Sequence, residues 1–291
     1  MQQGQHNVTA ALARALIAAQ MPDLAALPLR RVGVAGTDNV LFRLGRDLVA
    51  RFPRLPHAEV QIAVLARWLP GVAPLVPVDV PLGQRFGQAG PGYPFAWSVG
   101  RWLPGRTAFN ALPELGSAAQ TMAQMLRALQ AHPVPQGAPQ HGVSYRLDLR
   151  LGGAEHFIAQ ITEFSDHAPL YRMLAQARAL PSRTGPGVWV HGDLHPLNLL
   201  VRRGRISAVI DWGSLGVGDP AVDMMLGWTL FDAPSRAVFR AAMAPSTGDW
   251  ARARAMAFAK AIVALPCYRH SNPAFHAVMA RTLGQVMLDA A

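Results

Sequence analysis

The residues best suited to chemistry are Asp193, Asn198 and Asp211, two carboxylates and one amide within a short stretch of the chain. Hard oxygen donors of this kind suit Mg²⁺, and a carboxylate beside the metal can orient a hydroxyl and accept its proton. Mg²⁺-dependent phosphoryl transfer requires this combination. Taken singly, Asp193 has a plainer explanation as a turn cap, and Asn198 as the start of a strand. Their joint spacing favours Asp193 as the base and Asn198 and Asp211 as metal ligands.

A predicted β-hairpin explains how the two metal ligands come together. Two apolar β runs flank an Arg-Gly-Arg turn, at residues 198–202 and 206–211. With Gly204-Arg205 as the loop, Asn198 and Asp211 face each other across the open end, with Cβ atoms about 5 Å apart. A loop shifted by one residue offsets the pair but leaves the two residues neighbours.

The first hundred residues carry the pattern of a sheet with helices. Apolar residues recur at helical spacing before Pro22, which closes a first helix. Short runs rich in β-branched and aromatic residues follow, separated by turn signals, and a helix interrupts them. We expect five strands at residues 29–34, 40–44, 48–52, 75–80 and 95–102, with the interrupting helix at 57–69. These elements make a five-stranded antiparallel sheet carrying a helix.

The best domain boundary is Leu103-Pro104-Gly105, because strands dominate before it and helices after it. We predict an α+β protein of two lobes, residues 1–102 and 103–291. Helical patterns cover most of the second lobe, and a short strand leads into the motif. We expect helices at 113–131, 145–164 and 167–180, a strand at 188–190, and roughly four further helices after Asp219-Pro220, broken near Pro234, Pro245 and Pro273.

Composition narrows the possible functions. The net charge of +10 would permit binding to nucleic acid, but the basic residues are scattered singly and in pairs, which argues against that role. Lys260 is the only lysine, so a cation used in the site is expected to be arginine. The single cysteine, Cys267, fits a reducing compartment. Because we find neither a signal-peptide pattern nor an apolar run of roughly 18 residues, we expect a cytoplasmic protein without membrane or nucleic-acid partners.

Three segments of the second lobe resemble the aminoglycoside phosphotransferase family, whose members share the bilobal protein-kinase-like fold. They are H-G-D-L-H-P-L-N-L-L at 191–200, I-D-W at 210–212 and G-V-G-D-P-A-V-D at 216–223. Weaker similarity in the first lobe extends the resemblance to most of the chain. The resemblance implies transfer of the γ-phosphate of ATP, or alternatively GTP, with Mg²⁺. It implies as acceptor a hydroxyl of a small molecule, such as a macrolide, an aminoglycoside or a metabolite.

The resemblance also implies a role for individual residues. Asp193 is the catalytic aspartate, and Asn198 and Asp211 hold the Mg²⁺ that bridges the ATP phosphates. The expected nucleotide contacts in the first lobe and hinge are Gly36, Thr37, Asn39, Arg51, Arg101, Trp102 and Leu103. The residues expected to brace the catalytic loop and its surroundings are His191, His195, Asp219 and Asp223. Asp219 can equally be the cap of the following helix.

Two residues depart from the family pattern in the first lobe. Arg51 stands where the family has a phosphate-binding lysine, and Leu65 where an acidic partner for it is expected. Arginine keeps the charge and binds phosphate oxygens with a different geometry, and Gln61 lies one turn earlier, where it can orient Arg51. Alternatively, Arg51 is an ordinary surface residue of its strand. The departure raises a second hypothesis, a nucleotide-binding pseudokinase with little transfer activity.

The acceptor is the part of the function that the sequence determines least. A polycationic aminoglycoside calls for a strongly acidic cleft, whereas acidic residues are few in the last third of the chain. We therefore favour a less charged acceptor. Some negative charge is available from the middle helices, at Asp148, Glu155, Glu163 and Asp166.

Overall fold

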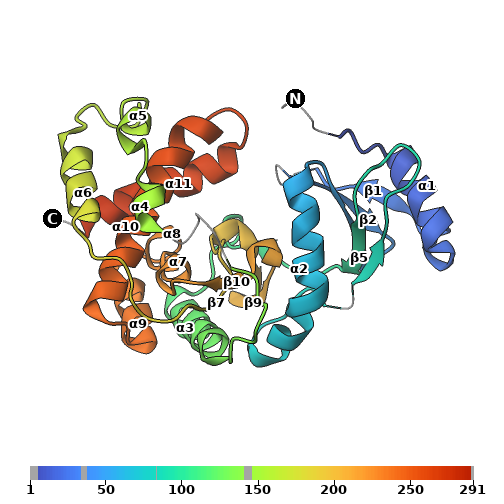
Figure 1. Cartoon of the computed structure of the whole chain (residues 1–291), viewed down its shortest axis with the longest axis horizontal. Coiled ribbons are helices and arrows are strands. Elements are labelled where there is room, and N and C mark those ends of the chain that lie inside the picture. Colours follow the sequence, from blue (N-terminus) through green and yellow to red (C-terminus); the bar gives the residue numbers. More distant parts are fainter. Residues whose placement is uncertain (1–5, 34–37, 83, 141–145, 290–291) are drawn as a thin grey trace. The chain divides into compact units, whose positions relative to one another are not determined.

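The computed structural model describes residues 6–33, 38–82, 84–140 and 146–289. Contacts within the chain divide it into two compact units. The first comprises Met1–Pro74 and Asp79–Pro104, and the second comprises Leu75–Val78 and Gly105–Ala291. Many of the elements of both units are labelled in Figure 1.

The first unit is built on a five-stranded antiparallel sheet, as predicted (Figure 1). Its strands follow the spatial order β1-β2-β3-β5-β4. The elements are α1 (Ala10–Gln20), β1 (Leu29–Arg31), β2 (Asn39–Leu44), β3 (Leu48–Pro53), α2 (Pro56–Val72), β4 (Arg85–Gly87) and β5 (Trp97–Arg101), with 3₁₀ turns at Pro22–Leu24 and Ala73–Leu75.

One face of this sheet forms an aromatic core. Phe42 and Phe52 are fully buried, and the Phe52 ring stacks on Trp97 of β5 with centroids 4.9 Å apart. Leu16 and Ile17 of α1 belong to the same cluster, so α1 covers this face. Burial of each such side chain contributes about 1.5–3 kcal/mol. α2 contacts β3 and β5, which places it against the strand that carries Arg51.

The strand predicted at residues 75–80 is wrong. That segment leaves a 3₁₀ turn as irregular chain, and the sheet takes its edge strand from Arg85–Gly87 instead. Prolines before, within and after the segment remove backbone donors, which disfavours a continuous strand there. The end of α2 also lies later than predicted. The helix continues through Pro70, where Leu69 and Val72 are both buried.

The second unit is mainly helical, with α10 packed against α11 and α3 against α9. The helices are α3 (Leu115–Ala131), α4 (Leu147–Arg150), α5 (Ala154–Ile158), α6 (Ala168–Arg178), α7 (Ala221–Met224), α8 (Leu226–Thr229), α9 (Ala233–Met243), α10 (Thr247–Tyr268) and α11 (Pro273–Leu288). The single helix predicted over 145–164 is wrong. The described part of that segment contains the two short helices α4 and α5, separated by Gly153 with a left-handed φ of 70°.

Short strands in the second unit position the motif. They are β6 (Arg106–Thr107), β7 (Val188–Val190), β8 (Leu199–Arg202), β9 (Arg205–Val209) and β10 (Gly216–Gly218). β6, β8 and β9 form one sheet, and β7 pairs with β10, so the strand predicted at residues 188–190 is confirmed. Among the residues that the structure describes, no helix is both long and apolar enough to cross a bilayer.

Candidate active site

The hairpin of β8 and β9 turns one residue earlier than predicted. Its loop is Arg203-Gly204, with left-handed φ angles of 51° and 74°, as a type I′ turn requires. Arg202 pairs with Arg205 across the loop, so the predicted loop Gly204-Arg205 is wrong. The physical reason is that such turns favour glycine at their second position, where the left-handed backbone costs it least.

This register leaves Asn198 and Asp211 offset by one residue. A β-bulge lies between Leu200 and Val201, and the Asn198 carbonyl accepts the N–H of Ile210 at 2.9 Å. Asp211 follows directly, with a left-handed φ of 60°, at the start of the 3₁₀ turn Trp212–Ser214. The two predicted metal ligands are therefore neighbours, although they do not face each other directly.

Asp193 lies in the loop between β7 and the 3₁₀ turn Pro196–Asn198, with its side chain partly exposed. The Asn198 side-chain nitrogen lies 2.9 Å from the Asp193 backbone carbonyl and 3.3 Å from Asp193 Oδ2. The candidate base and one candidate ligand are thus in direct contact. Because the amide nitrogen serves the loop, the amide oxygen of Asn198 is the atom suited to a cation.

Lys260 is a residue of this site that the sequence reasoning missed. From the middle of α10, its ammonium reaches to 2.6 Å from Asp193 Oδ1, so the expectation of an arginine is wrong at this position. Burial acts to raise the pKa of the Asp193 carboxyl, but Lys260 and His195 outweigh it and hold that pKa well below its usual value. Asp193 is therefore ionised at neutral pH. The only sequence signal was the presence of one lysine in a chain rich in arginine.

His191 and Asp223 hold the backbone of the loop. The N–H groups of His191 and Gly192 donate to the two carboxylate oxygens of Asp223, at 2.7 and 2.8 Å. The His191 ring accepts the Asp193 N–H at 3.2 Å, and its Nε2 donates to the Ile210 carbonyl at 3.1 Å. Burial lowers the pKa of His191 to about 4, so the ring is neutral at pH 7, and burial raises that of Asp223 to about 7. These contacts fit the expected role of His191 and Asp223 in bracing the loop that carries Asp193.

Asp223→Ala is expected to lower the free energy of unfolding by about 1–3 kcal/mol for each of the two N–H groups that lose their acceptor. Asp223→Asn keeps one acceptor oxygen and should lose about half as much. Urea unfolding at pH 7 measures the free energy of unfolding of both variants. The control is Asp166→Ala, because Asp166 accepts the Ala168 N–H at an exposed site, where water can replace it. An Asp223→Ala variant as stable as this control would contradict the bracing role.

His195 packs the loop against α11. Its Nδ1 accepts the Leu197 N–H at 3.3 Å, and its Nε2 lies 3.2 Å from Asn198 Nδ2 and 3.5 Å from Asp193 Oδ2. The ring meets Phe275 edge-on, with centroids 5.1 Å apart. These contacts match the loop-packing role expected of His195, and they add a weak contact to the candidate base.

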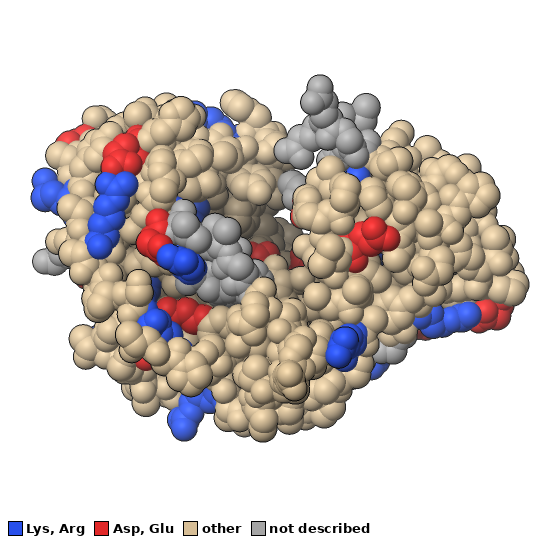
Figure 2. Space-filling model, viewed as in Figure 1, with Lys and Arg blue, Asp and Glu red and all other residues tan. Residues whose placement is uncertain are grey.

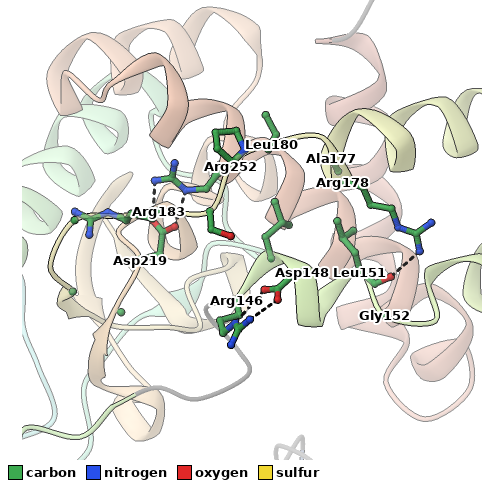
Figure 3. A pocket seen from close by; sticks show the side chains of 16 residues that line it. Arg146, Asp148, Leu151, Gly152, Ala177, Arg178, Leu180, Arg183, Asp219 and Arg252 are labelled. Atoms are coloured by element: carbon green, nitrogen blue, oxygen red, sulfur yellow. Dashed lines mark hydrogen bonds and ion pairs between the residues drawn. The ribbon is translucent and has the colours of Figure 1, made fainter.

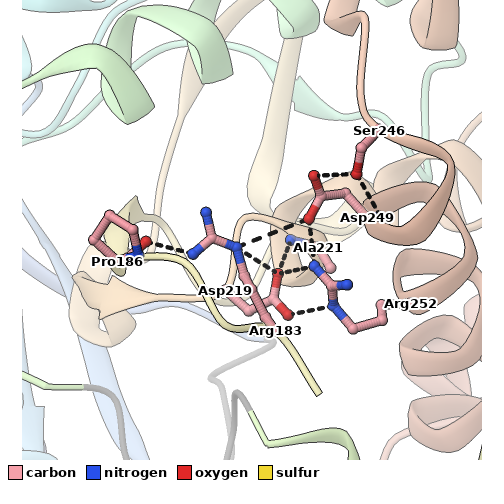
Figure 4. Close-up of polar contacts among 7 residues, drawn as sticks. All are labelled: Arg183, Pro186, Asp219, Ala221, Ser246, Asp249 and Arg252. Atoms are coloured by element: carbon pink, nitrogen blue, oxygen red, sulfur yellow. Dashed lines mark hydrogen bonds and ion pairs between the residues drawn. The ribbon is translucent and has the colours of Figure 1, made fainter. Parts of the chain in front are cut away.

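Asp219 belongs to a network of charged side chains (Figure 4). Its Oδ2 accepts from Arg252 Nε at 2.7 Å, and Arg183 Nε lies 3.9 Å from its Oδ1. Asp249 forms ion pairs with both arginines. Oδ1 of Asp219 also accepts the Ala221 N–H at 2.9 Å, which caps the first turn of α7. These contacts fit the capping role and join the start of α7 and the segment before β7 to α10, while a bracing role for Asp219 in the catalytic loop stays a prediction.

A cavity of about 640 Å³ opens beside this network (Figure 3). Four arginines line it, and each has a carboxylate partner: Arg146 has Asp148, Arg178 has Glu155, and Arg183 and Arg252 share Asp219 and Asp249. These pairs balance the positive charge of the cavity. Its lining in the described chain does not include Asp193, Asn198 or Asp211.

In the first unit, Gln61 orients Arg51, as predicted. Arg51 Nη2 on β3 donates to Gln61 Oε1 on α2 at 2.9 Å. Leu65 is buried, and Glu59 accepts the Ala96 N–H at 2.7 Å, so that carboxylate is directed elsewhere. The α2 residue in contact with Arg51 is therefore the amide Gln61, and the position of the expected acidic partner is the buried Leu65.

Most of the other residues predicted to bind nucleotide also lie in the first unit. These are Asn39, Arg101, Trp102 and Leu103, while Gly36 and Thr37 lie outside the described residues. Asn39 is buried at the start of β2. At the end of β5, Arg101 is exposed and Leu103 is buried, and the Trp102 N–H donates to the Asp47 carbonyl at 2.7 Å. Their contacts with nucleotide stay a prediction.

Comparison with known proteins identifies related sequences. The model of the "Phosphotransferase enzyme family" matches residues 29–258. The aminoglycoside 3'-phosphotransferase of Escherichia coli is 25% identical over 140 residues, which cover 46% of this chain and 52% of that protein. The uncharacterized protein YcbJ of Bacillus subtilis is 44% identical over 43 residues, 14% of each chain. The chain thus spans about half the length of the first of these relatives and a smaller share of the second.

Solved structures show the same fold. The GDP complex of wild-type aminoglycoside 2'-phosphotransferase-IIIa matches with a TM-score of 0.74 at 17% identity, over 98% of this chain and 100% of that one. The apoenzyme of macrolide 2'-phosphotransferase MphH from Brachybacterium faecium matches with a TM-score of 0.62 at 24% identity, over 94% and 97%. The predicted α+β fold is confirmed. Since the family model covers most of its length, this chain belongs to the phosphotransferase enzyme family.

Proposed function

We propose that this protein is a small-molecule kinase, which moves the γ-phosphate of ATP or GTP to a hydroxyl group. The observation that carries the proposal is the loop around Asp193. Its ionised carboxylate contacts Asn198, and the hairpin brings Asp211 next to Asn198. Membership of the family supports the reaction class.

Asp193 is the proposed base. It would orient the acceptor hydroxyl and take up its proton as the oxygen bonds to phosphorus. A carboxylate with a depressed pKa is a weak base, which fits a loose transition state. In such a transition state the phosphoryl group has largely left its donor before the hydroxyl needs to lose its proton. Asp193 therefore holds the hydroxyl in line first and takes up its proton late in the reaction.

The donor set fits Mg²⁺. Asn198 Oδ1 and the Asp211 carboxylate are hard oxygen ligands. Two protein ligands would suffice for Mg²⁺ when nucleotide phosphates and water occupy its other coordination positions. When bound, Mg²⁺ neutralises charge on the transferring phosphate. The nucleotide itself would be held in part by Arg51, whose guanidinium Gln61 orients. One structural relative is a GDP complex, so we propose that ATP and GTP are both candidate phosphate donors, to be compared by their rates of transfer.

We propose an acceptor with little positive charge. Three of the four acidic side chains that could attract a polycation are paired with arginine: Asp148 with Arg146, Glu155 with Arg178, and Glu163 with Arg269. The fourth, Asp166, accepts the Ala168 N–H. Figure 2 shows several acidic side chains lying directly against basic ones. Lys260 adds a further positive charge beside Asp193. A polycationic acceptor would be repelled there, so a macrolide, a sugar or an uncharged metabolite fits better.

An acceptor panel tests the proposal. With Mg-ATP or Mg-GTP, we expect kcat/KM for weakly charged hydroxyl compounds to exceed that for aminoglycosides by at least about tenfold, or ~1.4 kcal/mol. Release of nucleoside diphosphate that depends on the acceptor is the measurement, with Asp193→Ala as the inactive control. A preference for kanamycin over every weakly charged compound would contradict the proposed acceptor class.

The first unit supports a second candidate, a nucleotide-binding pseudokinase, because Leu65 occupies the position of the expected acidic partner and Arg51 contacts the amide of Gln61. Both candidates require binding of Mg-nucleotide, which at about 100 times its dissociation constant stabilises the fold by roughly 2.7 kcal/mol. Thermal unfolding detects this in either case. Only the kinase transfers phosphate to an acceptor in an Asp193-dependent reaction. Stabilisation without transfer across the panel would favour the pseudokinase.

A further inference from the structure

Lys260 differs from the other basic side chains in type and in surroundings. It is the only lysine in a sequence whose other strongly basic residues are all arginine. It stands in the middle of α10 between buried Ala259 and Ala261, and only 14% of its side chain is exposed. A lysine is rarely buried unless it is paired, and its partner is Asp193.

The two carboxylate oxygens of Asp193 have different environments. Oδ1 is 2.6 Å from the Lys260 ammonium, a short charge-assisted contact. Oδ2 is 3.3 Å from Asn198 Nδ2 and 3.5 Å from His195 Nε2, which are long and therefore weak contacts. Oδ1 is thus firmly held, and Oδ2 is the oxygen available to a hydroxyl.

We infer that Lys260 is a positioning residue, which fixes Asp193 through Oδ1 and leaves Oδ2 to receive the proton of the acceptor. This inference rests on the proposed kinase function. In that reaction the acceptor oxygen bonds to the γ-phosphorus as the bond to the β-phosphate oxygen breaks. The hydroxyl proton passes to Oδ2, and nucleoside diphosphate leaves.

The chemistry of the two basic side chains explains why lysine stands here. An ammonium is a compact charge that can pair with one oxygen, whereas a guanidinium tends to bind both oxygens of a carboxylate in parallel. An arginine at this position would therefore compete with the acceptor for Oδ2. A lysine keeps the charge and leaves that oxygen accessible.

Phe275 of α11 packs against both Lys260 and His195, the two residues that flank the Asp193 carboxylate. The Lys260 ammonium lies 5.7 Å from the centroid of its ring, and the His195 ring meets it edge-on at 5.1 Å. A cation is attracted to an aromatic face at such a distance. Helices α10 and α11, packed against each other, therefore support the orientation of Asp193 from outside its own loop.

Kinetics of two Lys260 variants test the inference. Lys260→Met, which removes the charge at similar length, is expected to lower kcat about 10- to 100-fold with nucleotide KM within about threefold. Lys260→Arg should unfold at the wild-type temperature and still lose about tenfold in kcat, because it engages both oxygens. Arg172→Met, which removes an exposed charge on α6, is the matched control and should keep wild-type kcat. Wild-type kcat in either Lys260 variant would overturn the inference.

A second measurement does not depend on phosphotransfer. Urea unfolding of wild type, Asp193→Ala, Lys260→Met and the double variant forms a double-mutant cycle. We expect the two substitutions to be coupled by at least about fivefold in the unfolding constant. If the wild type transfers no phosphate, the proposed function fails. The cycle would still measure the interaction between Asp193 and Lys260. Coupling below about twofold would overturn the inference even in an active enzyme.

Discussion

Asp193→Asn is expected to lower kcat for phosphate transfer by about 10²- to 10⁴-fold, the range for loss of a general base. Asparagine has nearly the same shape as aspartate, but it cannot accept the proton of the hydroxyl. It also removes the charge that pairs with Lys260. Nucleotide affinity should stay within about threefold, since the substitution removes an interaction with the acceptor and not with the donor.

Single-turnover transfer and thermal unfolding with Mg-nucleotide separate these two effects. The matched control is Asp232→Asn, because Asp232 caps α9 by accepting the Ser235 N–H, a task that asparagine performs equally well. That control should keep wild-type turnover. Transfer by Asp193→Asn within about fivefold of wild type would remove Asp193 from the role of base.

The arrangement of the proposed catalytic loop could be predicted from sequence because its parts are local. Asn198 and Asp211 are joined by a tight hairpin, and any tight turn at Gly204 leaves them neighbours. The precise register was beyond prediction, since a bulge between Leu200 and Val201 changes the pairing without a clear sequence signal. The Gln61–Arg51 contact was also predictable, because a helix spaces its side chains regularly.

Long-range contacts were not predictable in this way. Lys260 lies 67 residues from Asp193, and only the packing of α10 beside the loop brings them together. The same helix supplies Arg252 to Asp219, 33 residues away. The edge strand at Arg85–Gly87 was missed because it is short, and the longer, mainly apolar run at residues 75–80 matched a strand except for Pro77. Sequence patterns predict individual helices and strands. Contacts between residues of distant elements can be identified only from the folded structure.

Asp211→Asn is expected to lower kcat by at least about 10²-fold, because a metal ion supplies several kcal/mol of transition-state stabilisation in such reactions. The backbone should be unaffected. Asp211 has a left-handed φ of 60°, and asparagine is among the residues that tolerate this conformation best. The loss would therefore come from the changed side chain and not from the backbone. Thermal unfolding with nucleotide should show a Mg²⁺-dependent increment in wild type that Asp211→Asn lacks.

The two proposed ligands are not interchangeable, and exchanging them sharpens the test. The Asn198 nitrogen lies 2.9 Å from the Asp193 carbonyl, so a carboxylate at position 198 would face that oxygen and Asp193 Oδ2 with no proton to share. The double variant Asn198→Asp with Asp211→Asn keeps one carboxylate and one amide, yet it should be no more active than Asp211→Asn. Recovery of wild-type turnover would show that only the number of oxygen ligands matters, and that the Asn198–Asp193 contact has no part in the chemistry.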